Sequence, residues 1–305
     1  MNKSPLIISL IRIKDDIIAH KFVLGPILVI IFTLALFFIQ ISGVTETLTK
    51  PEYIEAGLNL ADSLPTIPPS DYPKLVIVID DCGQNRDGVK EMFDIPETLT
   101  FAVLPFSEKG FDDANTAYSN GHEIILHIPF FTNKVPQAWL GSKIIQPTMD
   151  KDEIYSYLDE AFEQIPFAIG LNNHIGPMGC DNSFTTDTIL SYLSQKNKIL
   201  IDSATSSGSA STSEISAYKL ASLHNMEKRV LTRTFFLDGS QNPTVASVKQ
   251  QIKKAASYAH EHGLAVVIGH VGTEGGKRTA TAIKELLPWL AENNVHIVGA
   301  SQATQ

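Results

Sequence analysis

From Lys74 onward the chain alternates between short apolar runs rich in β-branched residues and longer stretches with helical periodicity. Most of the apolar runs are continuous, which is typical of strands in a parallel sheet that is covered on both faces. The predicted strands are Leu75–Asp80, Thr98–Leu104, Glu123–Ile128, Ala168–Asn173, Ile199–Asp202, Thr232–Leu237, Leu264–Gly269 and His296–Val298. The predicted helices are Gly110–Asn120, Asp150–Gln164, Thr186–Asn197, Ser213–His224, Val245–His262 and Thr279–Asn293. This alternation predicts an α/β fold, an irregular (β/α) barrel of seven or eight strands, with an open doubly wound sheet as the alternative.

A long uncharged segment precedes this domain. Phe22–Ile41 has 20 residues and no charged side chain, and a helix of that length spans the roughly 30 Å hydrocarbon core of a bilayer. Lys14 and Lys21 come before it, so the positive-inside rule places the short N-terminus in the cytoplasm. We therefore expect one transmembrane helix in the inner membrane, with the domain on the periplasmic or extracellular side. A cleavable signal peptide is the alternative, although its apolar core is usually only about 7–15 residues long.

The expected organisation has four parts. Residues 1–21 form the cytoplasmic N-terminus, 22–41 the anchor, 42–73 a Pro-rich tether, and 74–305 the barrel domain. The tether is inferred from its prolines and its weak apolar periodicity. In the alternative interpretation, Tyr53–Leu64 packs on the barrel as an additional helix, because its apolar residues approximate one helical face.

Charge and motif composition exclude several classes of partner. The net charge is −9 although the first 21 residues carry +2, and an acidic domain lacks the clustered Lys and Arg that a nucleic-acid partner requires. Gly272–Arg278 reads GTEGGKR but does not complete a phosphate-binding loop, and no G-x-G-x-x-G follows the first strand, so no nucleotide is expected. Two cysteines, Cys82 and Cys180, exclude a disulfide scaffold. They are either unrelated thiols or one bridge in an oxidising compartment.

Polar side chains follow most of the predicted strands at the point where each strand ends. The carboxyl ends of parallel strands meet at one rim, so these side chains are expected to lie near one another. Adjacent carboxylates repel unless a cation or a proton separates them, and two imidazoles with one carboxylate are a common catalytic zinc set. Each residue also has a structural interpretation as a turn, cap or hydrogen-bonded residue. The candidates are Asp80, Asp81, His127, Asn173, His174, Asp202, Ser203, Asp238 and His270.

Six motifs, in order, resemble those of the divergent polysaccharide deacetylases, which are distant relatives of the metal-dependent polysaccharide deacetylases. They are LVIVIDDCG, GHEIILHIPF, GLNNHIG, IDSATS, RTFFLDG, and IGH followed by KELLPWLAENNVHIVGAS, and they cover residues 74–301. The resemblance implies a distorted (β/α) barrel with Asp80 as general base and His270 as general acid. It implies Asp81 and His127 as metal ligands, and the N-H motif points to His174 as the third.

The chain also departs from the larger family. Phe131 stands where that family has its second metal-binding His, and the R-x-P-Y segment has no clear counterpart. Phe130 and Pro177 differ from the residues usual in the divergent branch and change the substrate-side surface. Phe131 and the missing R-x-P-Y segment favour a non-catalytic glycan-binding or envelope-assembly protein, whereas the retained Asp pair and three rim histidines favour an enzyme.

The activity that the resemblance implies is metal-dependent hydrolysis. A divalent metal, with zinc as the expected ion, would activate water to remove acetyl or similar acyl groups from an envelope polysaccharide such as peptidoglycan. The remaining rim residues are expected to contact that substrate. They are Asn173, Asp202, Ser203 and Asp238.

Overall fold

The computed structural model describes residues 72–84, 86–131, 140–141, 143–174, 183–203, 217–239 and 242–304. All of them fall within one of the chain's two units, Thr66–Gln305. The expected cytoplasmic segment, the expected anchor, nearly all of the tether, and Cys180 with its possible bridge lie outside the described residues. Among the helices that the structure describes, none combines the length and apolar character needed to cross a bilayer.

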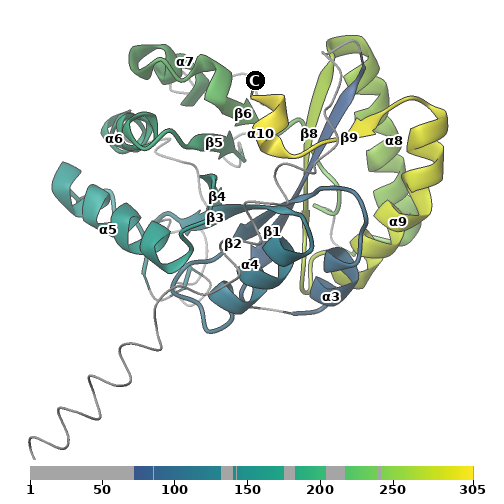
Figure 1. Cartoon of the computed structure of the whole chain (residues 1–305), viewed down its shortest axis with the longest axis horizontal. Coiled ribbons are helices and arrows are strands. Elements are labelled where there is room, and N and C mark those ends of the chain that lie inside the picture. Colours follow the sequence, from purple (N-terminus) through teal and green to yellow (C-terminus); the bar gives the residue numbers. More distant parts are fainter. Residues whose placement is uncertain are drawn as a thin grey trace, which may run out of the picture. The chain divides into compact units, whose positions relative to one another are not determined.

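Nine parallel strands form one curled sheet in the described part of the chain (Figure 1). They are β1 (Lys74–Cys82), β2 (Thr100–Val103), β3 (Glu123–Pro129), β4 (Gly170–His174), β5 (Ile199–Asp202), β6 (Val230–Thr232), β7 (Phe235–Phe236), β8 (Leu264–His270) and β9 (His296–Ile297). Their order is β6-β5-β4-β3-β2-β1-β8-β7, and β9 pairs with the first two residues of β1. The curled parallel sheet is consistent with the predicted (β/α) barrel and not with an open doubly wound sheet.

The predicted strand Thr232–Leu237 is two short strands in the structure, because the chain changes partners between them. The Arg233 amide donates to the Asp202 carbonyl at 2.9 Å, and the Thr234 amide donates to the Val266 carbonyl at 2.7 Å. As a result β6 pairs with β5, whereas β7 pairs with β8. Residues 230–237, which we call the seam, therefore connect the two ends of the strand order.

Helices α4 to α9 cover the outside of the curled sheet (Figure 1). The helices are α3 (Val89–Phe93), α4 (Gly110–Ser119), α5 (Lys151–Gln164), α6 (Ser183–Gln195), α7 (Ala217–Ala221), α8 (Val245–His262), α9 (Gly276–Glu292) and α10 (Ala300–Ala303). Five of the predicted helices are confirmed. The sixth, residues 213–224, is within the described residues only the short α7 followed by a 3₁₀ turn. Helices α3 and α10 were not predicted, because four or five residues are too few to show helical periodicity.

Local sequence determines several helix ends. Asp150 and Glu153 form a capping box at the start of α5, and Thr244 and Ser247 form another at the start of α8. Each box satisfies backbone amides that the first helical turn leaves unpaired. Gly263 ends α8 in the left-handed conformation, with φ 82°, as expected for a glycine at this position.

The strands bury both of their faces, and the two faces differ toward the carboxyl ends. On β1, Ile77 and Ile79 pack in the cluster that includes the helices, whereas Val76 and Val78 belong to a separate cluster inside the curled sheet. Side chains alternate along a strand, so Asp80 continues the interior series. The same alternation gives an interior that is apolar at the amino ends of the strands and polar at their carboxyl ends. The polar positions are Asp80, His127, Asn172, His174 and His270.

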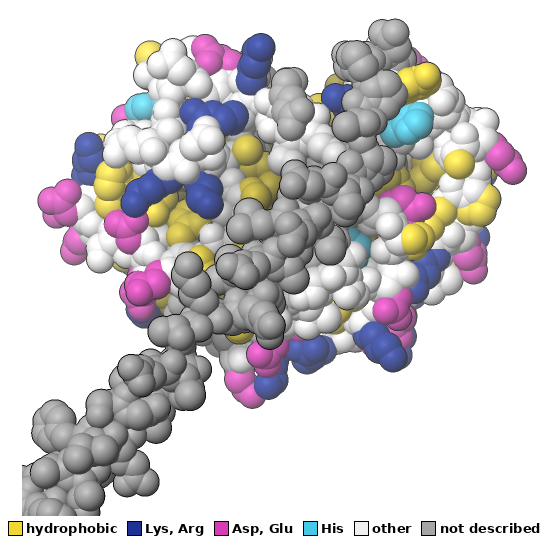
Figure 2. Space-filling view, in the orientation of Figure 1, with side chains coloured by type: hydrophobic (Ala, Val, Ile, Leu, Met, Phe, Trp, Pro, Cys, Tyr) yellow, Lys and Arg dark blue, Asp and Glu magenta, His cyan; other side chains and the backbone are white. Residues whose placement is uncertain are grey.

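The surface agrees with the charge balance of the sequence. On the face shown in Figure 2, the described Lys and Arg side chains are interspersed with Asp and Glu and do not gather in one patch.

Candidate metal and acid–base site

Two consecutive carboxylates, Asp80 and Asp81, approach the same imidazole. Asp81 Oδ1 lies 3.2 Å and Asp80 Oδ2 3.8 Å from His127 Nε2. In a regular strand adjacent side chains point to opposite faces. Here Asp81 has φ 69°, and the register of β1 with β2 shifts between Ile79 and Cys82. This bulge directs both carboxylates toward one site, and Asp is among the few residues that adopt the left-handed conformation readily.

The bulge is followed by a glycine that the local packing requires. Gly83 has φ 105°, and a β-carbon there would come within 3.0 Å of the Gly110 α-carbon. The Gly83 amide donates to the buried Asp113 carboxylate at 3.0 Å, and Asp113 also pairs with Arg86. Helix α4, which carries Asp113, therefore holds the turn that follows the Asp pair.

Three of the predicted site residues bring their ligating atoms together. Asp81 Oδ1 lies 3.2 Å from His127 Nε2 and 3.1 Å from His174 Nδ1, and the two nitrogens are 2.9 Å apart. A carboxylate oxygen and two imidazole nitrogens are donors that suit zinc and related divalent metals. Phe131, in contrast, has 43% of its surface exposed and offers no ligand atom. The donor set therefore fits a divalent cation.

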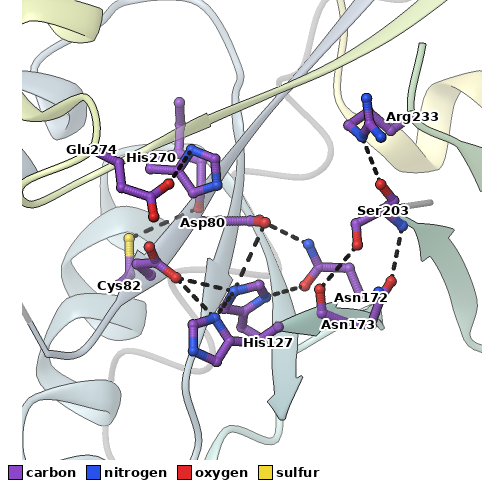
Figure 3. Close-up of polar contacts among 12 residues, drawn as sticks. Asp80, Cys82, His127, Asn172, Asn173, Ser203, Arg233, His270 and Glu274 are labelled. Atoms are coloured by element: carbon purple, nitrogen blue, oxygen red, sulfur yellow. Dashed lines mark hydrogen bonds and ion pairs between the residues drawn. The ribbon is translucent and has the colours of Figure 1, made fainter. Parts of the chain in front are cut away.

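A fourth residue, Asn172, joins this group although the sequence analysis did not select it. Its amide nitrogen donates to Asp80 Oδ1 at 2.7 Å, and its Oδ1 lies 2.6 Å from His127 Nδ1 (Figure 3). Asn172 is fully buried and in register with His127 across β3 and β4. The signal in the sequence was its spacing of two from His174, which places both side chains on one face of the strand.

The two carboxylates have opposite pKa shifts. Burial raises the pKa of Asp80 above its ordinary value, although the nearby His127 opposes this rise. For Asp81 burial acts in the same direction, but hydrogen bonds from His127 and His174 hold the pKa well below its ordinary range. Asp81 is therefore suited to remain an anionic ligand, and Asp80 is suited to accept a proton.

An imidazole–carboxylate pair, His270 and Asp238, lies on the other side of Asp80. His270 Nδ1 is 2.7 Å from Asp238 Oδ1, and the His270 amide donates to Asp238 Oδ2 at 2.9 Å. Thr279 Oγ1 donates to the same Oδ2 at 2.7 Å. Burial would lower the pKa of His270, but the hydrogen bond and the charge of Asp238 raise it to about 10. The ring is thus a proton donor whose Nδ1 is committed to Asp238.

Replacing Asp238 by Asn should lower the pKa of His270 from about 10 toward 6.5. Because the folded-state pKa is the higher one, the pair stabilises the fold fully below pH 6.5, and this contribution is lost as pH rises through 10. NMR titration of the His270 ring and urea unfolding between pH 6 and 10 measure both effects. The control is Asp187→Asn, which breaks another His–Asp contact, Asp187 to His224 at 2.7 Å. An unshifted His270 in Asp238→Asn would contradict the assignment.

The other predicted substrate-binding residues make contacts within the protein. Asn173 Oδ1 accepts from the Ser203 amide at 2.9 Å, and the Ser203 hydroxyl donates to the Asn173 carbonyl at 3.2 Å. Both are buried and join the ends of β4 and β5 (Figure 3). Asp202 is half-buried at the end of β5, and Asp238 is the partner of His270. Substrate contact by these four residues stays a prediction.

Arg233 on the seam is a second residue that the sequence analysis missed. Its guanidinium lies 3.7 Å from the centre of the Phe236 ring, and its Nε donates to the Ser203 carbonyl at 2.6 Å. Burial lowers the pKa of Arg233, while the charges of Asp202 and Asp80 oppose that shift. A positive charge therefore faces the site from the seam. The signal in the sequence was that Arg233 belongs to the motif RTFFLDG, the same motif that contains Asp238.

Known proteins resemble this chain in sequence and in fold. It is 30% identical over 198 residues to the uncharacterized protein YibQ of Escherichia coli K12, covering 65% of this chain and 58% of that protein. It is 29% identical over 197 residues to an uncharacterized Haemophilus influenzae protein, covering 65% and 66%. The matches thus span less than two thirds of either relative.

Among solved structures, the uncharacterized protein ATU2773 of Agrobacterium tumefaciens C58 superposes with a TM-score of 0.65 at 17% identity, over 79% of this chain and 93% of that one. The Enterococcus faecalis V583 protein EF3048 superposes with a TM-score of 0.53 at 12% identity, over 76% and 99%. At these sequence identities the similarity to the two solved structures shows a shared fold and nothing more. The sequence profile of the divergent polysaccharide deacetylases matches residues 77–304, and the chain belongs to that family.

Proposed function

We propose that this protein is a metal-dependent hydrolase that removes acetyl or similar acyl groups from an envelope polysaccharide. The observation that carries the proposal is the convergence of Asp81, His127 and His174 within 3.2 Å of one another. A buried carboxylate, Asp80, lies beside them, and the His270–Asp238 pair lies opposite. Membership in the deacetylase family supports a glycan substrate.

The residues divide the chemistry between them. Asp81, His127 and His174 would hold the cation, which when bound polarises an acyl carbonyl and makes water a better nucleophile. Asp80, whose pKa burial raises, accepts a proton from the attacking water. His270, held at Nδ1 by Asp238, donates a proton from its other ring nitrogen to the leaving amine or hydroxyl.

The site of action follows from the N-terminal sequence. We propose that residues 22–41 anchor the chain in the inner membrane as a single pass and that the domain works on the periplasmic or extracellular side. The polymers available there are peptidoglycan-type glycans and exported polysaccharides. The exposed Phe131, which stands in a metal-ligand position of the larger family, is the observation that favours the alternative of a non-catalytic glycan-binding protein.

Metal content and acetate release test this proposal on the full chain purified in detergent. We expect about one zinc per chain in the wild type and much less in His174→Ala. Wild type should release acetate from acetylated peptidoglycan or N-acetylated oligosaccharides, lose this activity on chelation, and regain it when zinc is added. A protein that binds zinc and glycan without releasing acetate would establish the non-catalytic alternative. A wild type without bound metal would overturn the metal site.

A further inference from the structure

One buried amide, that of Asn172, joins the proposed base to a proposed metal ligand. It contacts Asp80 through its nitrogen at 2.7 Å and His127 through its oxygen at 2.6 Å. The side chains of all three residues are buried. We infer that Asn172 is a positioning residue that keeps His127 protonated at Nδ1 and so directs the Nε2 lone pair toward Asp81 and His174. The inference rests on the ligand role proposed for His127 and does not depend on the substrate.

The orientation of the Asn172 amide follows from its two neighbours. An ionised Asp80 carboxylate only accepts hydrogen bonds, so the NH₂ group of Asn172 must face it. The carbonyl oxygen of Asn172 must then face His127, and that oxygen also only accepts. The ring nitrogen 2.6 Å from it, Nδ1, therefore carries the hydrogen. Asp80 thus determines the orientation of the Asn172 amide, and the amide determines the tautomer of the His127 imidazole.

The tautomer matters because the two nitrogens of His127 have competing acceptors. On the other side of the ring, Nε2 lies 3.2 Å from Asp81 Oδ1, and this carboxylate would favour a hydrogen on Nε2. Such a tautomer would point an N–H bond at the place where a cation must accept the lone pair. The contact with Asn172 is shorter than that with Asp81 and opposes this arrangement. Partners of this kind around metal-binding His side chains typically change metal affinity about 10–100-fold.

The neighbouring asparagine provides a matched control. Asn173 is as buried as Asn172 and lies on the same strand. Its side chain bonds the Ser203 amide at 2.9 Å and does not contact His127 in any hydrogen bond of the described residues. Replacing Asn173 should perturb packing to a similar degree without changing the hydrogen bond at Nδ1 of His127.

The experiment measures tautomers and zinc affinity without any substrate. The metal-free wild type is examined by ¹⁵N NMR of its imidazoles, with His127 assigned by mutation, and zinc affinity is measured by competition with a chromophoric chelator. Burial lowers the pKa of His127, but the charges of Asp80 and Asp81 raise it overall, so the spectra are recorded at a pH where the ring is neutral, and there we expect Nδ1–H in the wild type. Asn172→Leu should convert His127 to the other tautomer and weaken zinc binding about 10–100-fold. Asn173→Leu should retain the wild-type tautomer.

Two results would overturn the inference. One is an Nε2–H tautomer in the metal-free wild type, a measurement that needs no variant and so holds even if Asn172→Leu does not fold. The other is a folded Asn172→Leu with unchanged tautomer and zinc affinity. Absence of acetate release would count against the proposed hydrolase but would leave the tautomer result standing.

Discussion

Replacing Asp80 by Asn should lower the rate of acetate release by about 10²–10⁴-fold, the range typical for removal of a general base. The substitution keeps the size of the side chain and an oxygen that can accept the hydrogen bond from Asn172. It removes the carboxylate that accepts a proton. Because Asp80 Oδ2 is 3.8 Å from His127 Nε2, farther than the 3.2 Å of Asp81 Oδ1, zinc should remain bound. Steady-state kinetics and zinc titration of the same preparation provide both readouts.

The adjacent substitution is the control for this result. Asp81→Asn changes the same functional group one residue away, and Asn tolerates the left-handed backbone of this position. If Asp80→Asn lost as much zinc as Asp81→Asn, both carboxylates would be ligands, and the division into base and ligand would be wrong.

The second large effect concerns the metal. Removing a ligand directly, by His174→Ala or Asp81→Asn, should weaken zinc binding by more than the roughly 10–100-fold that outer partners of metal ligands contribute. Zinc that binds only the folded protein raises its melting temperature, so these variants should also lose the stabilisation that added zinc gives the wild type. Calorimetric titration and thermal unfolding with and without zinc measure the two losses.

His122 offers a matched imidazole outside the site. It is buried, its Nε2 lies 3.1 Å from the Phe93 carbonyl, and its Nδ1 accepts from the Leu99 amide at 3.3 Å. His122→Gln should lower stability but leave zinc affinity unchanged. Equal loss of zinc affinity in His122→Gln and His174→Ala would show that general destabilisation, and not ligand removal, causes the effect.

The alternation of elements was readable from the sequence because each strand and helix has its own periodicity. The division of the seam into two strands was not, because residues 230–237, VLTRTFFL, have the β-branched and aromatic composition of a strand whether they pair with one neighbour or with two. Pairing partners depend on tertiary position. The exchange of β5 for β8 between Arg233 and Thr234 has no local signature.

The sequence was sufficient to predict which strands contribute residues to the site. Its ligating atoms come from strand ends, and strand ends are visible in sequence. Two details depended on backbone geometry. The left-handed bulge at Asp81 brings neighbouring carboxylates to one side, and strand parity selects Asn172 over Asn173 for the interior. If the predicted register of β4 is wrong by one residue, Asn173 points to the interior in place of Asn172.

The seam also bears on how the domain opens. Its two strands contain three and two residues, so few hydrogen bonds hold it, and such segments exchange their amide protons through low-energy local unfolding. Asp238 directly follows the seam, next to Leu237, whose amide bonds the Ile268 carbonyl at 2.8 Å. The carboxylate of Asp238 in turn bonds His270 and Thr279, so the end of the seam is tied to β8 and α9 through the same residue that orients the proton donor. We therefore expect the amides of the seam to exchange faster in Asp238→Asn than in the wild type, which hydrogen exchange measures.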